Sequence, residues 1–507
     1  MKPETAAGEE LKSFVQEYPG ATTCVVIGAV QPEWREQLSR ARAVLWCADE
    51  RDCAAGAPAV AGERMHFFPL AGASLAQWSE ALVRFVRLDA RRLPSVFVAA
   101  AEADDDERRR APFVAVVVDE LREQHRGRVT RQQDGFRWQQ HVLANLSRYT
   151  RRPLPSEWRG ALAGLPAAVC GAGPSLDLSA PRLGAGQEGC VVFAADSALR
   201  TLARHGVRVD FAVSIDVAKL PEKCLPETGE LPGRVVLSAV SPAGWSERVG
   251  KERVHFVSSR QITTDWLAKS GVPAPALASA ENCGVTALEL ARWLGCAPIF
   301  LFGLDLALSG RQRHTGAADA SIYVRSGFDA AQEFSKVPGN WEERVSTHAP
   351  GDWRALNARL ASFPAGSVFN VNDRGARLEN ATPVRPDAWT PPEACAKAER
   401  LALLARGGAD APAPAAATAA LAELRACGRR LLATTPELRR ALAARGPEAV
   451  AVALRPVLAD PAFGRALGGF ALKLMPHLLP PTEGDADFWR GLLDEFEALA
   501  IALESVG

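Results

Sequence analysis

Short runs of apolar residues, separated by segments with helical spacing, recur between residues 165 and 302 and constrain the possible folds most strongly. These runs are Ala167–Cys170, Cys190–Ala195, Asp210–Ile215, Arg234–Ala239, Arg253–Val257 and Pro298–Phe302. Continuous rather than alternating apolar runs are typical of strands covered on both faces. Strands that alternate with helices predict parallel βαβ units. We therefore expect a central Rossmann-like α/β domain over residues 160–385.

The flanking regions differ from this centre. Residues 1–150 hold further apolar runs at Thr23–Gly28, Ala43–Trp46, Ser95–Val98 and Phe113–Val118, which predict a small N-terminal α/β domain. Residues 119–165 are predicted to be helical and bridging. An Ala/Pro linker is expected at 407–418, and Ala, Leu and Arg in helical spacing predict a C-terminal helical domain over 390–507. The predicted fold class is α/β with three parts.

Charge, hydropathy and cysteine content limit the classes of partner and the cellular location expected for this chain. The formal net charge is +0, so no overall basic field favours nucleic acid. The N-terminal residues lack the features of a secretory signal, and no apolar run reaches about 18 residues, so no membrane span is expected. Ten cysteines without a CxxC pair predict buried, reduced thiols and a cytoplasmic protein.

The candidate site residues follow the predicted strands, because ligands of parallel α/β sheets bind at the carboxyl ends of strands. The first group is Gly171, Gly173, Pro174 and Ser175, a glycine-rich turn whose amides are expected to point outward. Together with the Ser175 hydroxyl they are expected to hold a phosphate or nucleoside. A bulky residue at Gly173 should then abolish nucleotide binding and leave the fold intact. A tight turn without a ligand is the alternative.

Two carboxylates follow the next two strands. Asp196, with Ser197 beside it, and Asp216 come directly after apolar runs. Each carboxylate is expected to accept ribose hydroxyls, or to bind a divalent metal if one is used. Helix or turn capping is the alternative.

A helix start and a histidine complete the set. Asn282 is a predicted N-cap, and Cys283 and Gly284 follow it with free amides suited to an anion. Asp305 ends the last central strand, and His314 follows in a loop, where an imidazole near a carboxylate can act as a general base.

The remaining histidines are weaker candidates. His348 is the reserve base, whereas His205 and His255 are predicted to be structural. If His314 is the base and has the unperturbed pKa of about 6.5, the rate should have an acidic limb near that pH.

Several ordered segments resemble the motility accessory factor (Maf) family, whose members are regarded as flagellin glycosyltransferases. They are Gly171–Asp177, Ala195–Leu199, Asp210–Asp216, Gly303–Ala307 with His314, Val337–Asn340 with Val345–Thr347, and Phe369–Ala376. The resemblance covers about 165–385. The same core is similar to bacterial sialyltransferases that use CMP-sialic acid, and to 6-hydroxymethylpterin diphosphokinase MptE-like proteins.

The resemblance implies a function and roles for the candidate residues. The chain would transfer a nonulosonic, sialic-acid-like sugar from a CMP-activated donor to Ser/Thr hydroxyls of a protein acceptor, expected to be flagellin. The glycine-rich turn would hold CMP, Asn282, Cys283 and Gly284 would face the donor carboxylate, and His314 would deprotonate the acceptor. Asp305 is assigned to catalysis with His314. Asp196 and Asp216 depart from the sialyltransferase pattern, which tends to use Asn there.

Two other functions remain open. One is Mg²⁺-dependent transfer of pyrophosphate from ATP to a pterin, for which Asp196, Asp216 and Asp305 would be suited. The other is non-catalytic nucleotide binding, with the helical domain docking a partner. For the transferase no obligatory cofactor or metal is expected.

Overall fold

The computed structural model describes residues 23–58, 64–86, 93–100, 104–259, 261–280, 282–310, 312–316, 334–407, 414–478 and 484–506. The chain divides into two compact units, Met1–Gln132 and Gln133–Gly507. The second unit contains both the expected central domain and the expected helical region. The N-terminal segment 1–22 and residues 408–413 of the expected linker lie outside the described residues.

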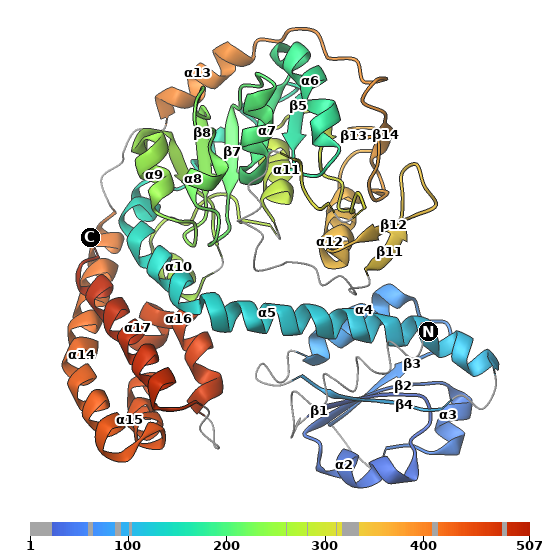
Figure 1. The fold of residues 1–507 in the computed structure, drawn as a ribbon, viewed down its shortest axis with the longest axis vertical. Helices are drawn as coiled ribbons and strands as arrows, with labels where there is room; N and C mark the ends of the chain where they lie inside the picture. Colours follow the sequence, from blue (N-terminus) through green and yellow to red (C-terminus); the bar gives the residue numbers. More distant parts are fainter. Residues whose placement is uncertain are drawn as a thin grey trace. The chain divides into compact units, whose positions relative to one another are not determined.

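An eight-stranded parallel sheet organises the second unit (Figure 1). Its strands are β5 (Ala167–Cys170), β6 (Val191–Ala195), β7 (Phe211–Ser214), β8 (Arg234–Leu237), β9 (Val254–Phe256), β10 (Ile299–Phe302), β13 (Val368–Val371) and β14 (Thr382–Val384). Their order is β14-β13-β10-β5-β6-β7-β8-β9. The six strands predicted from the apolar runs are all present, and the α/β fold class is confirmed.

The strands are apolar throughout because helices cover both faces of the sheet. Alternate residues point to opposite faces: Ala168, Val192 and Ala212 join one buried cluster, whereas Val169 and Phe193 join another. The first face packs on α6 (Leu176–Gly186), α7 (Leu199–Arg204), α9 (Gly244–Val249), α10 (Ile262–Lys269) and the end of α5 (Asp104–Arg151). The second face packs on α11 (Cys283–Trp293) and α12 (Pro350–Leu360).

The strand order indicates where on the sheet a ligand is expected to bind. From β5 the chain proceeds outward through β6 to β9, and it then returns to form β10 on the other side of β5. Loops leaving β5 and β10 therefore diverge, and open α/β sheets bind ligands at such a switch point. The predicted Gly171 turn and the Asp305 turn lie on these two loops.

A hairpin and an edge strand flank this region. Strands β11 (Ser335–Pro338) and β12 (Arg344–Thr347) pair antiparallel, with Val337 and Val345 packed on Ala307 and Ala376. Strand β14 lies at the edge of the sheet and contains Pro383, whose missing N–H suits a position without an outer partner.

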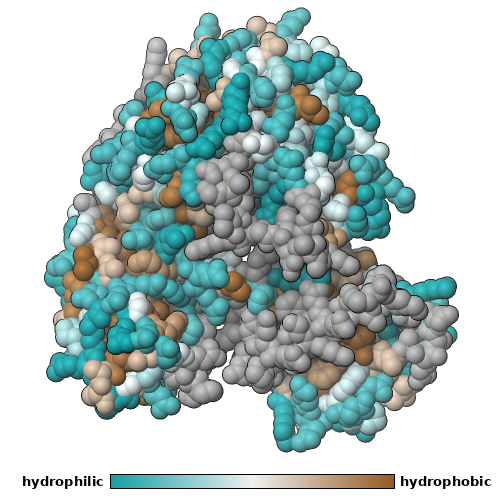
Figure 2. All heavy atoms as spheres, in the orientation of Figure 1, coloured by the Kyte–Doolittle hydropathy of each residue, from teal (hydrophilic) through white to brown (hydrophobic). Residues whose placement is uncertain are grey.

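Helices dominate the rest of the second unit, as predicted. They are α13 (Lys397–Gly407), α14 (Ala415–Arg445), α15 (Pro447–Ala459), α16 (Pro461–Leu474) and α17 (Ala486–Glu504), while the short helix α8 (Pro221–Cys224) lies in the sheet region. Hydrophilic side chains cover most of the face shown in Figure 2, and apolar areas lie mainly over these helices. No described helix combines the length and apolar character needed to cross a bilayer.

The first unit has its own parallel sheet of order β3-β2-β1-β4. Its strands are β1 (Thr23–Ile27), β2 (Ala43–Ala48), β3 (Met65–Pro69) and β4 (Ser95–Val98), and its helices are α2 (Arg35–Arg40), α3 (Glu50–Ala55) and α4 (Leu75–Val86). Strand β3 was not predicted, because it lies at the edge of the sheet, none of its residues is buried and only part of it is apolar.

The strand predicted at Phe113–Val118 is wrong, because this run lies within helix α5. Phe113, Val117 and Leu121 recur every four residues and are buried on one side of the helix. Charged residues precede and follow the run and favour helix continuation. All ten cysteines are free thiols, and eight of them are buried, as predicted.

Candidate functional site

The loops after β5 and β10 pack so closely that only glycine fits between them. The amide of Gly171 donates to the Phe302 carbonyl (2.8 Å) and the amide of Gly173 to the Gly303 carbonyl (2.7 Å). A Cβ on Gly173 would lie 2.6 Å from both the Gly303 oxygen and an Asp305 carboxylate oxygen. A bulky residue at Gly173 would therefore push the two loops apart, so we expect it to lower stability as well as nucleotide binding.

Ser175 faces into this loop pair, contrary to the predicted outward orientation. Its amide donates to Asp305 Oδ2 (2.8 Å), and its hydroxyl donates to Asp305 Oδ1. Ser175 and Asp305 are both almost fully buried, and burial raises the pKa of the Asp305 carboxyl to about 6, against the two hydrogen bonds from Ser175. This geometry favours a positioning role for both residues over direct nucleotide binding by Ser175 and catalysis by Asp305.

Asp196 is also buried and joins three elements. Its Oδ1 accepts from the Ser197 amide (2.7 Å) and hydroxyl (2.9 Å), and its Oδ2 accepts from the Ser214 hydroxyl (2.8 Å) and the Cys283 thiol (3.3 Å). Four donors leave this carboxylate little capacity for ribose or metal. The structure thus links β6, β7 and α11 through Asp196 rather than presenting the carboxylate to a ligand.

The start of α11 matches the predicted cap. Asn282 Oδ1 accepts from the Val285 amide (2.9 Å), and its Nδ2 donates to Asp352 Oδ2 (2.9 Å). Gly284 is needed because a Cβ there would lie 2.5 Å from Leu304. The amides of Cys283 and Gly284 belong to the first helical turn and have no intrahelical acceptor, so this end of α11 favours an anion. Burial, together with the Asp196 charge, raises the pKa of Cys283 well above its usual value and keeps it a thiol.

Asp216 and Lys219 follow β7. Asp216 is exposed and accepts the Ala218 amide at Oδ1 (2.8 Å). Desolvation by the surrounding protein raises the pKa of Asp216, and the Asp196 charge adds to the rise, whereas the Ala218 hydrogen bond and Lys219 oppose it. Lys219 is buried, with 8% of its surface exposed, and the Trp245 indole donates to its carbonyl (2.7 Å). Of the predicted carboxylates, Asp216 is the one accessible to a ligand.

His314 is half-buried beside the glycine-rich turn. A ring nitrogen hydrogen-bonds the Ala172 carbonyl, and the Thr315 amide also donates to that carbonyl (2.9 Å). Thr315 contacts Thr201 through their hydroxyls (2.6 Å), which holds this segment on α7. Burial, the Lys219 charge, His348 and Arg313 lower the pKa of His314 to about 3, although the Ala172 bond opposes this. The ring is therefore neutral at pH 7.

The reserve histidine lies close by. The rings of His314 and His348 are 6.5 Å apart between centroids, and His348 directly follows β12. His255 is buried within β9, and His205 is exposed at the end of α7, so neither belongs to this region.

The predicted residues thus lie around the carboxyl ends of β5, β6, β7 and β10, although their roles differ. Gly171, Gly173, Ser175, Asp196 and Asp305 build the floor. Pro174 is buried in the same turn. Sequence reasoning missed Lys219, because a lysine four residues past a strand end is usually solvated and its burial depends on the fold.

The arrangement combines positive potential with a neutral imidazole. Lys219 and the free amides at the start of α11 favour a ligand with negative groups, and Asp216 offers a carboxylate to hydroxyls. One ring nitrogen of His314 is bound to the Ala172 carbonyl, and its Nδ1 is buried. The arrangement therefore suits an anionic, hydroxylated ligand with a histidine beside it.

Comparisons with known proteins agree with this fold. Residues 140–311 match the family model described as 6-hydroxymethylpterin diphosphokinase MptE-like. The chain is similar to the solved Maf glycosyltransferase from Magnetospirillum magneticum AMB-1, with 16% identity and a TM-score of 0.51, over 99% of this chain and 82% of that chain. No curated protein matches the chain. The resemblance to Maf and MptE-like proteins is confirmed, and at this identity the solved structure establishes a shared fold.

Proposed function

We propose that the chain is a glycosyltransferase that moves a nonulosonic acid from a CMP-activated donor to Ser/Thr hydroxyls of a cytoplasmic protein acceptor, flagellin. The position of His314 at the β5/β10 switch point, bound to the Ala172 carbonyl of the glycine-rich turn, is the observation that carries this proposal. The similarity to a Maf glycosyltransferase supports it, since that match extends over 99% of the chain.

The donor chemistry suits the charges in the site. A CMP-nonulosonate carries a phosphate and a carboxylate, both anionic, and a ribose with free hydroxyls. Lys219 and the amides of Cys283 and Gly284 would attract the anionic groups. Asp216, exposed at the end of β7, would accept the ribose hydroxyls. The buried Asp196 and Asp305 would keep the surrounding loops in place.

The transfer step needs a base and stabilisation of the leaving group. The acceptor hydroxyl oxygen attacks the anomeric carbon, its proton passes to the neutral His314, and the bond between that carbon and the phosphate oxygen breaks. CMP leaves with the bonding electron pair. The positive charge of Lys219 would stabilise the charge that develops on the phosphate.

The diphosphokinase remains the second candidate, because the MptE-like family model matches residues 140–311. That reaction needs carboxylates free to hold Mg²⁺. Asp196 already accepts four hydrogen bonds and Asp305 accepts two from Ser175, which leaves Asp216 as the exposed member of the three. With two of its three carboxylates already bound by the protein, the site fits the transferase better.

A direct assay separates the candidates. The full-length chain is incubated with CMP-N-acetylneuraminic acid, with and without flagellin and EDTA, and CMP release is measured. We expect release that flagellin accelerates, and binding of CMP that persists in EDTA. In parallel, thermal shift with CMP should show stabilisation of about 2.7 kcal/mol at 100 times its Kd.

Two results would contradict the proposal. AMP release from ATP and a hydroxymethylpterin in Mg²⁺, with loss of CMP binding on chelation, would establish the diphosphokinase. Binding of CMP without turnover of either substrate would indicate a nucleotide-binding protein without catalysis.

A further inference from the structure

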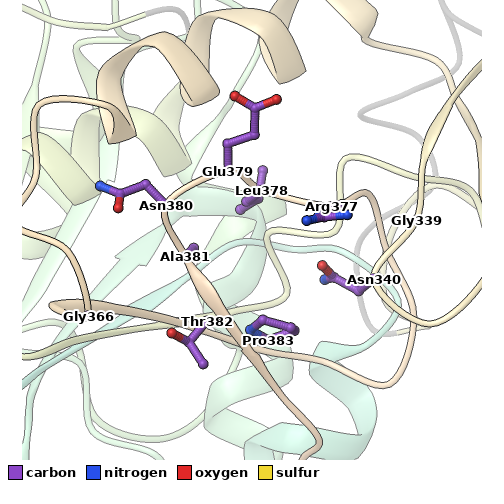
Figure 3. Close-up of a pocket in the computed structure, with 10 residues that line it drawn as sticks. All are labelled: Gly339, Asn340, Gly366, Arg377, Leu378, Glu379, Asn380, Ala381, Thr382 and Pro383. Carbon is purple, nitrogen blue, oxygen red and sulfur yellow. The ribbon is translucent and has the colours of Figure 1, made fainter.

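A hollow of about 420 Å³ lies along the edge of the sheet in the second unit, outside the site described above. It is lined by Gly339, Asn340, Gly366, Arg377, Leu378, Glu379, Asn380, Ala381, Thr382 and Pro383 (Figure 3). Its volume lies within the range of about 300–1,000 Å³ that is usual for ligand sites. The lining is mostly polar.

The wall formed by residues 377–380 is held firmly by the protein. The Arg377 amide donates to the Pro338 carbonyl (2.7 Å), the Trp353 indole donates to the Arg377 carbonyl (2.8 Å), and the Glu379 amide donates to Asn357 Oδ1 (2.8 Å). Asn380 has a positive φ of 58° and donates to two carbonyls of the α12 end. The protein thus already binds the backbone of the wall and the Asn380 side chain, which leaves the side chains of Arg377 and Glu379.

Arg377 and Glu379 are these available side chains. Both are exposed, and Leu378 between them turns into the core. Among the described residues neither forms an ion pair or a side-chain hydrogen bond. In Figure 3 Arg377 lies beside Asn340. The Asn340 Nδ2 donates to Asn372 Oδ1 (3.1 Å), so the amide oxygen of Asn340 remains as an acceptor. The hollow therefore presents a cation, an anion, an amide acceptor and the Thr382 hydroxyl.

The β11–β12 hairpin connects the hollow to the proposed base. Gly339 and Asn340 follow β11 at the turn, and His348 directly follows β12. The four residues of β12 extend about 13 Å. With the 6.5 Å between the His348 and His314 rings, a ligand in the hollow would be roughly 15–20 Å from His314, or about five or six residues of extended chain.

We propose that this hollow binds the acceptor polypeptide several residues away from the serine or threonine that is modified. The inference rests on the proposed function and adds a subsite for its acceptor. A polypeptide fits because it carries both charges and amides, and because it is long enough to reach His314 from the hollow. Pro383 has no N–H to donate at the outer edge of β14. The acceptor segment would therefore be held by side-chain contacts rather than by pairing with this strand.

Matched variants test the subsite. Arg377→Ala and Glu379→Gln remove its charges, whereas Arg248→Ala and Glu247→Gln change exposed residues of α9 and serve as controls. For the transferase reaction with flagellin, we expect Arg377→Ala to raise KM for flagellin about tenfold, equivalent to about 1.4 kcal/mol. Neither kcat nor donor hydrolysis without acceptor should change. With the wild type, we expect an acceptor peptide of about 13 residues centred on the modified hydroxyl to have a lower KM than a tripeptide. With Arg377→Ala, this difference in KM should disappear.

Binding measured without donor separates this inference from the proposed function. If the wild-type chain fails to turn over CMP-N-acetylneuraminic acid but Arg377→Ala weakens flagellin binding, the subsite stands and the proposed function fails. Equal flagellin affinity and equal KM in Arg377→Ala, Glu379→Gln and the controls would overturn the subsite. It would also be overturned if Arg377→Ala weakened binding of free N-acetylneuraminic acid but not of flagellin, since the hollow would then be a saccharide site.

Discussion

Three carboxylates at neighbouring strand ends have different surroundings and therefore different chemistry. Asp196 and Asp305 are each about 1% exposed and accept hydrogen bonds from neighbouring loops, whereas Asp216 is exposed. Buried carboxylates with matched donors stabilise one loop arrangement, because losing a partner leaves an uncompensated charge. Position at a strand end thus identifies the region of the site but not the role of each side chain.

The pKa of His314 leads to the first prediction at this scale. Burial and nearby charges lower it to about 3, so the ring stays neutral as the pH falls from 7 to about 4. The expectation of an acidic limb near 6.5 from His314 is therefore revised: in the proposed transferase, protonation of His314 should lower kcat/KM only at much lower pH, and a limb near pH 6 would come from Asp305. His314→Ala should lower kcat about 100-fold or more and leave CMP affinity nearly unchanged.

His205→Ala is the matched control, because His205 is exposed at the end of α7. The pH dependence of sugar transfer is measured for the wild type and both variants. A limb near pH 6.5 that disappears in His314→Ala would refute the lowered pKa. A normal kcat in His314→Ala would assign the proton transfer elsewhere, with His348 the next residue to test.

At the scale of elements, close backbone approach decides where the loops can lie. The loops after β5 and β10 meet through Gly171, Gly173 and Gly303, and a Cβ at any of them would lie 2.5–2.6 Å from a backbone oxygen of the other loop. The need for glycine at these positions follows from contacts between loops that form only in the folded chain. The same principle explains Gly284, where helix α11 begins against Leu304.

Gly173→Ala and Gly491→Ala should have opposite effects on stability. Gly173→Ala forces apart the Gly303 carbonyl and Asp305, an overpacking typically costing about 1–3 kcal/mol. Gly491 lies in α17 with nothing within 4 Å of an added Cβ, so alanine there should add up to about 1 kcal/mol through helix propensity. Thermal unfolding of each variant measures this, and equal midpoints for both would contradict the close packing of the loops.

At the scale of the second unit, the C-terminal helices attach to the α/β core through α16. A break at Leu467, with φ −128° and ψ 30°, interrupts this helix. Gln139 of α5 accepts the Gly469 amide (2.9 Å) and donates to the Ala466 carbonyl (2.8 Å) at this break. Apolar residues of the sheet, α14 and α17 belong to one continuous buried cluster. The helical region and the sheet therefore share a core.

Removing this bridge should destabilise the second unit. Gln139→Ala leaves two buried backbone groups without partners, at about 1–3 kcal/mol each, so we expect the midpoint of thermal unfolding to fall by several degrees. Gln140→Ala, at the exposed neighbouring position on the same helix, should have little effect. If both variants unfold at the wild-type temperature, Gln139 does not join the two regions.

The domain boundaries predicted at 150, 160–385 and 390–507 remain a proposal at this scale. The structure groups residues 133–507 together, and the shared core gives the reason. Composition marks a change near residue 390, but it does not indicate whether the helices that follow pack on the sheet.

The sequence alone determined six strands of the large sheet, their parallel arrangement and the segments that meet at the site, because local apolar runs and strand-end glycines carry that information. It also determined the cap at Asn282, since a cap depends on residues only three apart. The run at Phe113–Val118 was ambiguous, because consecutive apolar residues suit a buried strand or a helix face equally. Tertiary structure decided what sequence spacing does not contain: the burial of Asp196 and Asp305, the pKa of His314 and the position of Lys219. These three features depend on contacts with groups more than 80 residues away and on the exclusion of solvent. Such contacts and such exclusion arise only when the sheet brings its strand ends together.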